Sequence, residues 1–97
     1  MPAYWVSFIE VTDPQKFAGY AELAPAAVAK YGGKMVARGG KIALLEGAAA
    51  PGRMAVLEFP TLEQAVKCYN SPEYQAAKKK REGAANCTFV VTEGMTP

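Results

Sequence analysis

The sequence predicts one α+β domain in which four strands and two helical regions follow the order β-α-β-β-α-β. Three observations support this fold class. Four segments are rich in β-branched and aromatic residues, two regions between them carry apolar residues at helical spacing, and proline, glycine and capping residues mark the boundaries. A length of 97 residues suits one hydrophobic core and leaves no room for a second. We therefore treat residues 1–97 as a single domain.

The strand predictions rest on runs of apolar residues bounded by turn residues. Strands are expected over residues 3–11, 34–38 together with 41–46, 53–59 and 86–93, with a loop at 47–52. A glycine pair, Gly39-Gly40, joins the two pieces of the second strand and indicates a bulge, a bend or a tight hairpin. Both alternating faces of these strands are apolar apart from a few exceptions: Ser7, Glu10, Arg38, Arg53 and Glu58.

The helix predictions rest on capping residues and apolar stripes. The first helix is expected to begin at Thr12-Asp13-Pro14, to be kinked or split at Pro25, and to end at Gly32-Gly33. The second begins at Pro60-Thr61 and restarts at Ser71-Pro72, where a serine N-cap precedes a first-turn proline. The first helix carries a stripe of apolar and aromatic residues: Phe17, Tyr20, Ala21, Ala24, Val28 and Tyr31.

This order of elements is the pattern of ferredoxin-like domains, in which both helices cover one face of a four-stranded antiparallel sheet. The other face of such a sheet is normally polar, yet here it is predicted to be apolar. Leaving about eight such side chains in water would forgo roughly 1.5 kcal/mol each. The sequence therefore predicts a homodimer in which the open faces of two sheets pack together.

Composition excludes several classes of function. The net charge of +2 is too small to indicate a nucleic-acid or membrane partner, and no apolar stretch reaches the length of a membrane span. Two cysteines do not make a disulfide framework, and residues 1–5 lack the pattern of a signal peptide, so a cytoplasmic protein is expected. The chain contains no histidine, so we expect no metal site, no cofactor and no histidine-activated nucleophile.

Four segments carry a resemblance that spans nearly the whole chain: AYWVSFIEVTDPQKFAGY, AKYGGKMVARGG, VLEFPTLEQAVKCYNSPEY and FVVTEG. They resemble the domain of unknown function 1330 family of the dimeric α+β-barrel superfamily, which implies the same fold and a dimer. That superfamily includes cofactor-independent monooxygenases, muconolactone isomerase-like enzymes, haem-handling proteins and ligand-binding regulators. The lack of histidine argues against a haem role. The positions that match the family pattern are Arg38, Gly39, Gly40, Glu58, Phe59, Pro60, Tyr69, Ser71, Pro72 and Tyr74.

Arg38 is the candidate anion-binding residue. Its guanidinium can hold a carboxylate with two hydrogen bonds, and Gly39 and Gly40 would let the backbone approach the ligand closely. The alternative is an arginine that pairs with Glu46 or Glu58 to steady a bent strand.

Glu58 and three tyrosines are the candidate proton-handling groups. Glu58 interrupts an apolar strand, where a carboxyl group is either partly buried and suited to general-base catalysis, exposed at an edge, or paired with Arg38 or Arg53. Tyr20, Tyr69 and Tyr74 lie on or beside the helical stripes, where their hydroxyls would reach a pocket between helices and sheet. Aromatic residues at such spacing are as readily explained as core.

The remaining candidates have simpler structural explanations. Ser71 fits a helix N-cap, although that helix start would also suit an anionic ligand. Cys68 and Cys87 are expected to be small core residues. The basic run at residues 78–81 ends a helix and is expected to be solvated.

Three functions stay open from the sequence. The first is a cofactor-independent enzyme that acts on a small, partly apolar organic acid, with an anionic or aromatic ligand in the pocket. The second is a non-catalytic ligand-binding or stress-related dimer, and the third is a structural dimer without a ligand.

Overall fold

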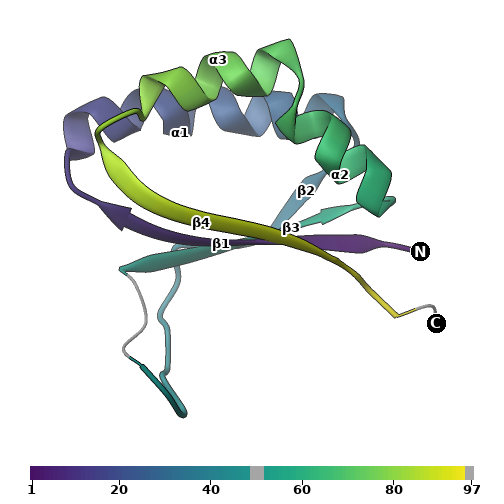
Figure 1. The fold of residues 1–97 in the computed structure, drawn as a ribbon, viewed down its shortest axis with the longest axis horizontal. Coiled ribbons are helices and arrows are strands. Elements are labelled where there is room, and N and C mark those ends of the chain that lie inside the picture. Colours follow the sequence, from purple (N-terminus) through teal and green to yellow (C-terminus); the bar gives the residue numbers. More distant parts are fainter. Residues whose placement is uncertain (49–51, 96–97) are drawn as a thin grey trace.

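The computed structural model describes residues 1–48 and 52–95, and it shows a four-stranded antiparallel sheet with three helices on one face (Figure 1). The elements are β1 (Ala3–Val11), α1 (Pro14–Lys30), β2 (Lys34–Arg38), β3 (Arg53–Phe59), α2 (Leu62–Tyr69), α3 (Pro72–Lys80) and β4 (Ala85–Glu93). The strand order in the sheet is β2-β3-β1-β4. The predicted ferredoxin-like fold is confirmed.

The helices begin at the capping residues that the sequence predicts. Asp13, Thr61 and Ser71 each accept a hydrogen bond from the backbone N–H three residues later, over 3.2, 3.0 and 3.1 Å. These bonds satisfy donors that a helix start otherwise leaves unpaired. Gly32, with a φ of +83°, turns the chain out of α1 in the left-handed conformation that glycine adopts without strain.

Two predictions about these elements are wrong. Helix α1 runs through Pro25 without interruption, so the expected split into two pieces does not occur; Ala24, Ala27 and Val28 around the proline are buried and hold the helix on the sheet. Residues 41–46 form no strand, since no neighbouring strand pairs with them among the described residues. The loop predicted at residues 47–52 falls partly on residues 49–51, which lie outside the described part of the chain.

The sheet has one covered face and one open face. Residues at odd positions of β1, β3 and β4 point toward the helices, as the cross-strand set Trp5, Leu57 and Val91 shows. Trp5 lies at the centre of the core, with its ring stacked on Phe59 and edge-on to Tyr74 at centroid distances of 5.9 and 5.2 Å. The large side chains of the core therefore lie between the sheet and the helices.

The open face carries apolar side chains with no helix above them (Figure 1). One cross-strand row consists of Val56, Val6 and Val90, of which Val90 is 51% exposed. We use the name open face for this surface, whose apolar members are Tyr4, Val6, Phe8, Met54, Val56 and Val90.

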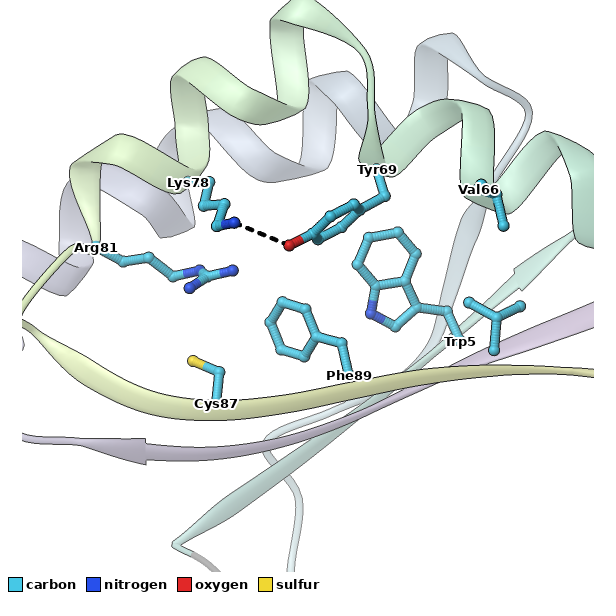
Figure 2. Close-up of a pocket in the computed structure, with 8 residues that line it drawn as sticks. Trp5, Val66, Tyr69, Lys78, Arg81, Cys87 and Phe89 are labelled. Carbon is cyan, nitrogen blue, oxygen red and sulfur yellow. Dashed lines mark hydrogen bonds between the residues drawn. The ribbon is translucent and has the colours of Figure 1, made fainter.

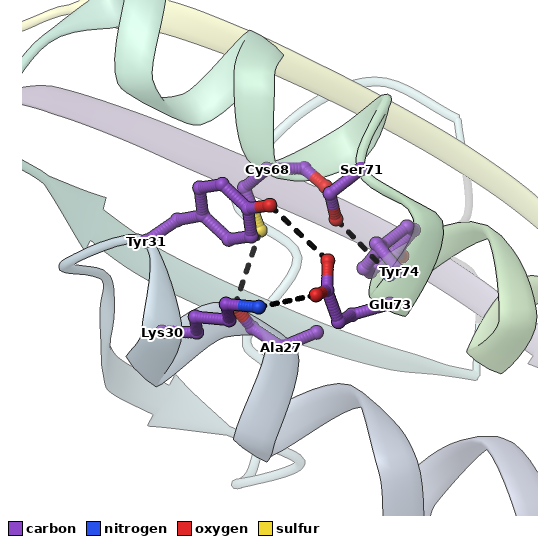
Figure 3. A network of polar contacts seen from close by, with 7 residues as sticks. All are labelled: Ala27, Lys30, Tyr31, Cys68, Ser71, Glu73 and Tyr74. Carbon is purple, nitrogen blue, oxygen red and sulfur yellow. Dashed lines mark hydrogen bonds and ion pairs between the residues drawn. The ribbon is translucent and has the colours of Figure 1, made fainter.

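A polar network joins the end of α1 to the turn between α2 and α3 (Figure 3). Glu73 pairs with the Lys30 ammonium and accepts a hydrogen bond from the Tyr31 hydroxyl at 3.1 Å. Nearby, the buried Cys68 thiol donates to the Ala27 carbonyl at 3.7 Å. These contacts join the end of α1 to the start of α3 and the end of α2.

Candidate functional site

An open cavity of about 440 Å³ lies between α2, α3 and strand β4 (Figure 2). This volume is within the range of small-molecule sites in proteins. It is lined by Trp5, Val66, Tyr69, Lys78, Arg81, Cys87, Phe89 and Val91. We call it the α3–β4 cavity.

Arg81 supplies a buried positive charge to the α3–β4 cavity. The residue is only 9% exposed, and its guanidinium carbon lies 4.9 Å from the ring centres of both Tyr20 and Phe89. No carboxylate pairs with it among the described residues, and its Nε has no hydrogen-bond acceptor there. A buried charge is normally paired, so Arg81 is a candidate anion-binding residue, whose charge a bound anion would neutralise.

The neighbouring tyrosines do not neutralise Arg81. Tyr20 and Tyr74 share a hydrogen bond between their hydroxyls. Burial raises the pKa of both hydroxyls, although the charge of Arg81 opposes that effect. Both hydroxyls are therefore neutral at physiological pH, and the positive charge of Arg81 stays uncompensated.

A second cation lines the same cavity and contacts a phenol. The Lys78 ammonium donates to the Tyr69 hydroxyl oxygen at 3.0 Å and lies 5.3 Å from the centre of that ring. Because this oxygen accepts the bond from Lys78, the Tyr69 hydroxyl proton stays free for an acceptor in the cavity. Both side chains are half-buried, so a ligand in the cavity can reach them.

Aromatic rings and a thiol complete the walls. The Trp5 ring is 2% exposed and forms the floor, with the rings of Tyr69 and Phe89 at centroid distances of 5.9 and 5.6 Å. The Cys87 thiol is half-buried, and burial raises its pKa, partly offset by the charge of Arg81. It is therefore a neutral, weakly polar part of the wall.

The polar groups of the cavity are hydrogen-bond donors. Tyr69, Lys78 and Arg81 all present N–H or O–H groups, and no carboxylate lines the cavity among the described residues. Such a cavity suits a flat or apolar molecule that carries negatively charged oxygen.

The candidate anion clamp of the sequence lies elsewhere. Arg38 ends β2 on the helix-covered face, exposed, beside a second cavity of about 50 Å³ that Arg53 also lines. That space is too small for an organic acid. Gly39 has a φ of +66° and donates its N–H to the Met54 carbonyl at 2.9 Å. At Gly40 a side chain would meet no other atom within 4 Å. Neither glycine lines a described cavity.

Glu58 lies on the open face, opposite the helices. It pairs across the ladder with Tyr4 and Lys34. Its carboxylate accepts a hydrogen bond from the Tyr4 hydroxyl at 3.3 Å and forms an ion pair with the Lys34 ammonium at 3.1 Å. The alternative ion pairs with Arg38 or Arg53 are not formed. The sheet thus separates Glu58 from Arg38 and from the α3–β4 cavity.

The other candidates divide between cavity and core. Tyr69 lines the α3–β4 cavity, whereas Tyr20 and Tyr74 lie behind it and border the smaller cavity. The buried Ser71 hydroxyl caps α3 and donates to the Cys68 carbonyl at 2.6 Å, so its hydrogen bonds are used within the fold.

Arg81 and Lys78 were missed by the sequence reasoning, which treated the basic run as solvated. That expectation is wrong for Arg81, which is buried. The burial of Arg81 could have been predicted from its spacing. Arg81 follows Tyr74 and Ala77 at intervals of three and four residues, which places it on the buried face of α3.

Two kinds of site find no support in the described part of the chain. Residues 1–48 and 52–95 contain no cluster of three side chains suited to hold a metal ion. Within the same residues, no helix has the length and apolarity to cross a bilayer.

Comparisons with known proteins agree on the fold. The family model described as "Domain of unknown function (DUF1330)" matches residues 2–95. A protein of unknown function from Rhodopseudomonas palustris is 19% identical, with a TM-score of 0.78 over 99% of this chain and 84% of that one. A comparison with curated proteins found no match.

Two further solved structures share the fold at lower identity. SnoaB, a cofactor-independent oxygenase from Streptomyces nogalater, is 12% identical with a TM-score of 0.64 over 99% of this chain and 95% of its own. A dimeric protein of unknown function with a ferredoxin-like fold from Bacteroides fragilis is 13% identical, with a TM-score of 0.55 over 96% of each chain. At these identities the likeness concerns the fold alone.

Proposed function

We propose that this chain, which belongs to the family of the domain of unknown function DUF1330, binds a small, partly aromatic organic acid in the α3–β4 cavity. The observation that carries the proposal is the buried guanidinium of Arg81, which no carboxylate of the described residues neutralises. An acid group on the ligand supplies the missing charge, and the aromatic walls bury the apolar remainder.

A calorimetric titration tests this proposal with benzoate and its neutral analogue benzamide. Wild-type protein is expected to bind benzoate at least about tenfold more tightly, since a hydrogen bond to a charged group contributes about 1.5–3 kcal/mol. Arg81→Met removes that preference, while the matched control Lys79→Met, at an exposed position of the same basic run, retains it. Circular dichroism checks that each variant is folded. Equal binding of the two compounds, or retained preference in Arg81→Met, contradicts the proposal.

A second candidate function is catalysis at a substrate oxygen. The hydrogen bond from Lys78 to Tyr69 favours it, because two donors held together in a cavity can stabilise negative charge that develops on a carbonyl or phenol oxygen. The fold shared with SnoaB, a cofactor-independent oxygenase, is compatible with a catalyst that uses side chains alone.

We also propose that the chain forms a homodimer through the open face. The row Val56, Val6 and Val90 and the aromatic side chains beside it are apolar and leave a surface that a second copy would bury. The dimeric protein from Bacteroides fragilis, which shares this fold, supports the idea.

A further inference from the structure

We infer that the acid bound in the α3–β4 cavity is a planar aromatic molecule with a second oxygen, a carbonyl, which Tyr69 and Lys78 hold while Arg81 holds the acid group. This inference rests on the proposed function and names the chemical class of its ligand. It follows from how the donors of the cavity divide into two groups.

The first group is Arg81, which is held in place by packing. The rings of Tyr20 and Phe89 lie 4.9 Å from its guanidinium carbon, and the residue is nine-tenths buried. A planar guanidinium fixed in this way loses little freedom when it pairs with a planar carboxylate. Arg81 is therefore the point where the acid group of the ligand belongs.

The second group is the pair formed by Tyr69 and Lys78. Their mutual hydrogen bond of 3.0 Å uses the phenol oxygen as acceptor and leaves the phenol proton and two ammonium protons unused. A carbonyl oxygen has two lone pairs and can accept from both side chains at once. An apolar group at the same place would leave both donors without partners, which disfavours its binding.

The shape of the walls selects a flat ligand. Tyr69, Phe89 and Trp5 contribute aromatic rings to the lining (Figure 2), and Val66 and Val91 add apolar surface to it. A planar aromatic ring gains contact with these faces that a bent aliphatic chain of equal size does not. The ligand class is thus an aromatic acid that carries a carbonyl group.

Matched pairs of benzoates test this inference. Each acetylbenzoate isomer is compared by calorimetry with the isopropenylbenzoate of the same substitution, because C=O and C=CH2 have nearly the same shape. We expect wild-type protein to prefer the acetyl compound at least about fivefold in the isomer whose carbonyl reaches the pair. We expect Tyr69→Phe and Lys78→Met each to reduce that preference, whereas the control Lys79→Met, at an exposed position of the same basic run, retains it.

The outcomes separate this inference from the proposed function. If every acid binds but no acetyl compound is preferred, the carbonyl is wrong and the organic-acid function stands. If the acetyl preference persists in both variants, Tyr69 and Lys78 do not hold the carbonyl. If benzoate has no advantage over benzamide in wild-type protein, the proposed function and this inference both fail.

Discussion

At the scale of single residues, the sheet places Tyr69 and Glu58 in different environments. Tyr69 lies in the α3–β4 cavity with Lys78 as its donor, whereas Glu58 lies on the open face between Tyr4 and Lys34. Of the two candidates, only Tyr69 is placed to donate a hydrogen bond to a ligand in the cavity. Glu58 is an ion-pair partner in the ladder.

Proton exchange beside a carbonyl distinguishes these roles. In D2O, water removes a methyl proton of bound acetylbenzoate, the electron pair moves onto the carbonyl oxygen, and a deuteron from solvent later replaces the proton. If the cavity is catalytic, wild-type protein accelerates this exchange, and Tyr69→Phe loses about 100-fold of the acceleration because an oxygen-stabilising donor is gone. Glu58→Gln leaves it unchanged. Proton NMR measures the rate, and no acceleration by wild-type protein would mean a binding protein without this activity.

The candidate site was only partly predictable, and the residues show why. Tyr69 and the location between helices and sheet came from helical spacing. Alternation along β3 puts Glu58 on one face of the sheet and Leu57 and Phe59 on the other. Nothing local to the strand says which of these faces the helices cover. Arg81 was missed because a basic run is usually solvated, and its burial depends on the aromatic rings of α1 and β4.

At the scale of elements, one carboxylate contributes a pH-dependent part of the contact between α1 and α3. The hydrogen bond from Lys30 holds the pKa of Glu73 below its ordinary value, with a smaller contribution from Tyr31. A carboxyl group whose pKa is lowered by folding stabilises the fold above its unfolded pKa, and that contribution is lost as the pH falls through its folded value.

We therefore expect Glu73→Gln to lower the melting temperature slightly at pH 7, and we expect this loss to shrink as the pH falls through the lowered pKa of Glu73. The loss is small because the ion pair is exposed. Thermal unfolding followed by circular dichroism at several pH values measures it. Glu22→Gln, at an exposed position of α1, is the control and should not change the pH dependence. An equal loss at pH 3 and pH 7 would contradict the assignment.

Most element boundaries were predictable because they are set by local chemistry. The helix starts are predictable from their N-cap residues, Asp13, Thr61 and Ser71, since these side chains accept hydrogen bonds from free backbone N–H groups of the first turn. The two errors depend on long-range contacts: Pro25 is tolerated within α1 because the sheet holds the residues around it, and residues 41–46 lack a partner strand in the described chain.

At the scale of the whole molecule, the open face is the apolar surface that the proposed dimer would bury. A substitution of Val6 by glutamate places a charge at the centre of the valine row, and two-fold symmetry places a second one in the partner. Burying two unpaired carboxylates costs several kcal/mol, so the proposed dimer should dissociate.

Light scattering after gel filtration tests this expectation. Wild-type protein at micromolar concentration should have twice the chain mass of 10.3 kDa, and Val6→Glu should have the mass of one chain while keeping its circular dichroism spectrum. Leu23→Glu, at a position of α1 that is 42% exposed, is the matched control and should remain dimeric. A monomeric wild-type protein refutes the dimer, and a dimeric Val6→Glu refutes the open face as its interface.

The alternation of side chains along the sheet has a consequence for how this family can diversify. In β1 and β4, odd positions such as Trp5, Cys87 and Phe89 border the cavity, while even positions such as Val6 and Val90 belong to the open face. If both proposals hold, selection can change ligand preference through the odd positions of these strands and self-association through the even positions. A library randomised at positions 87, 89 and 91 would change the proposed ligand site and leave the residues of the proposed dimer interface untouched.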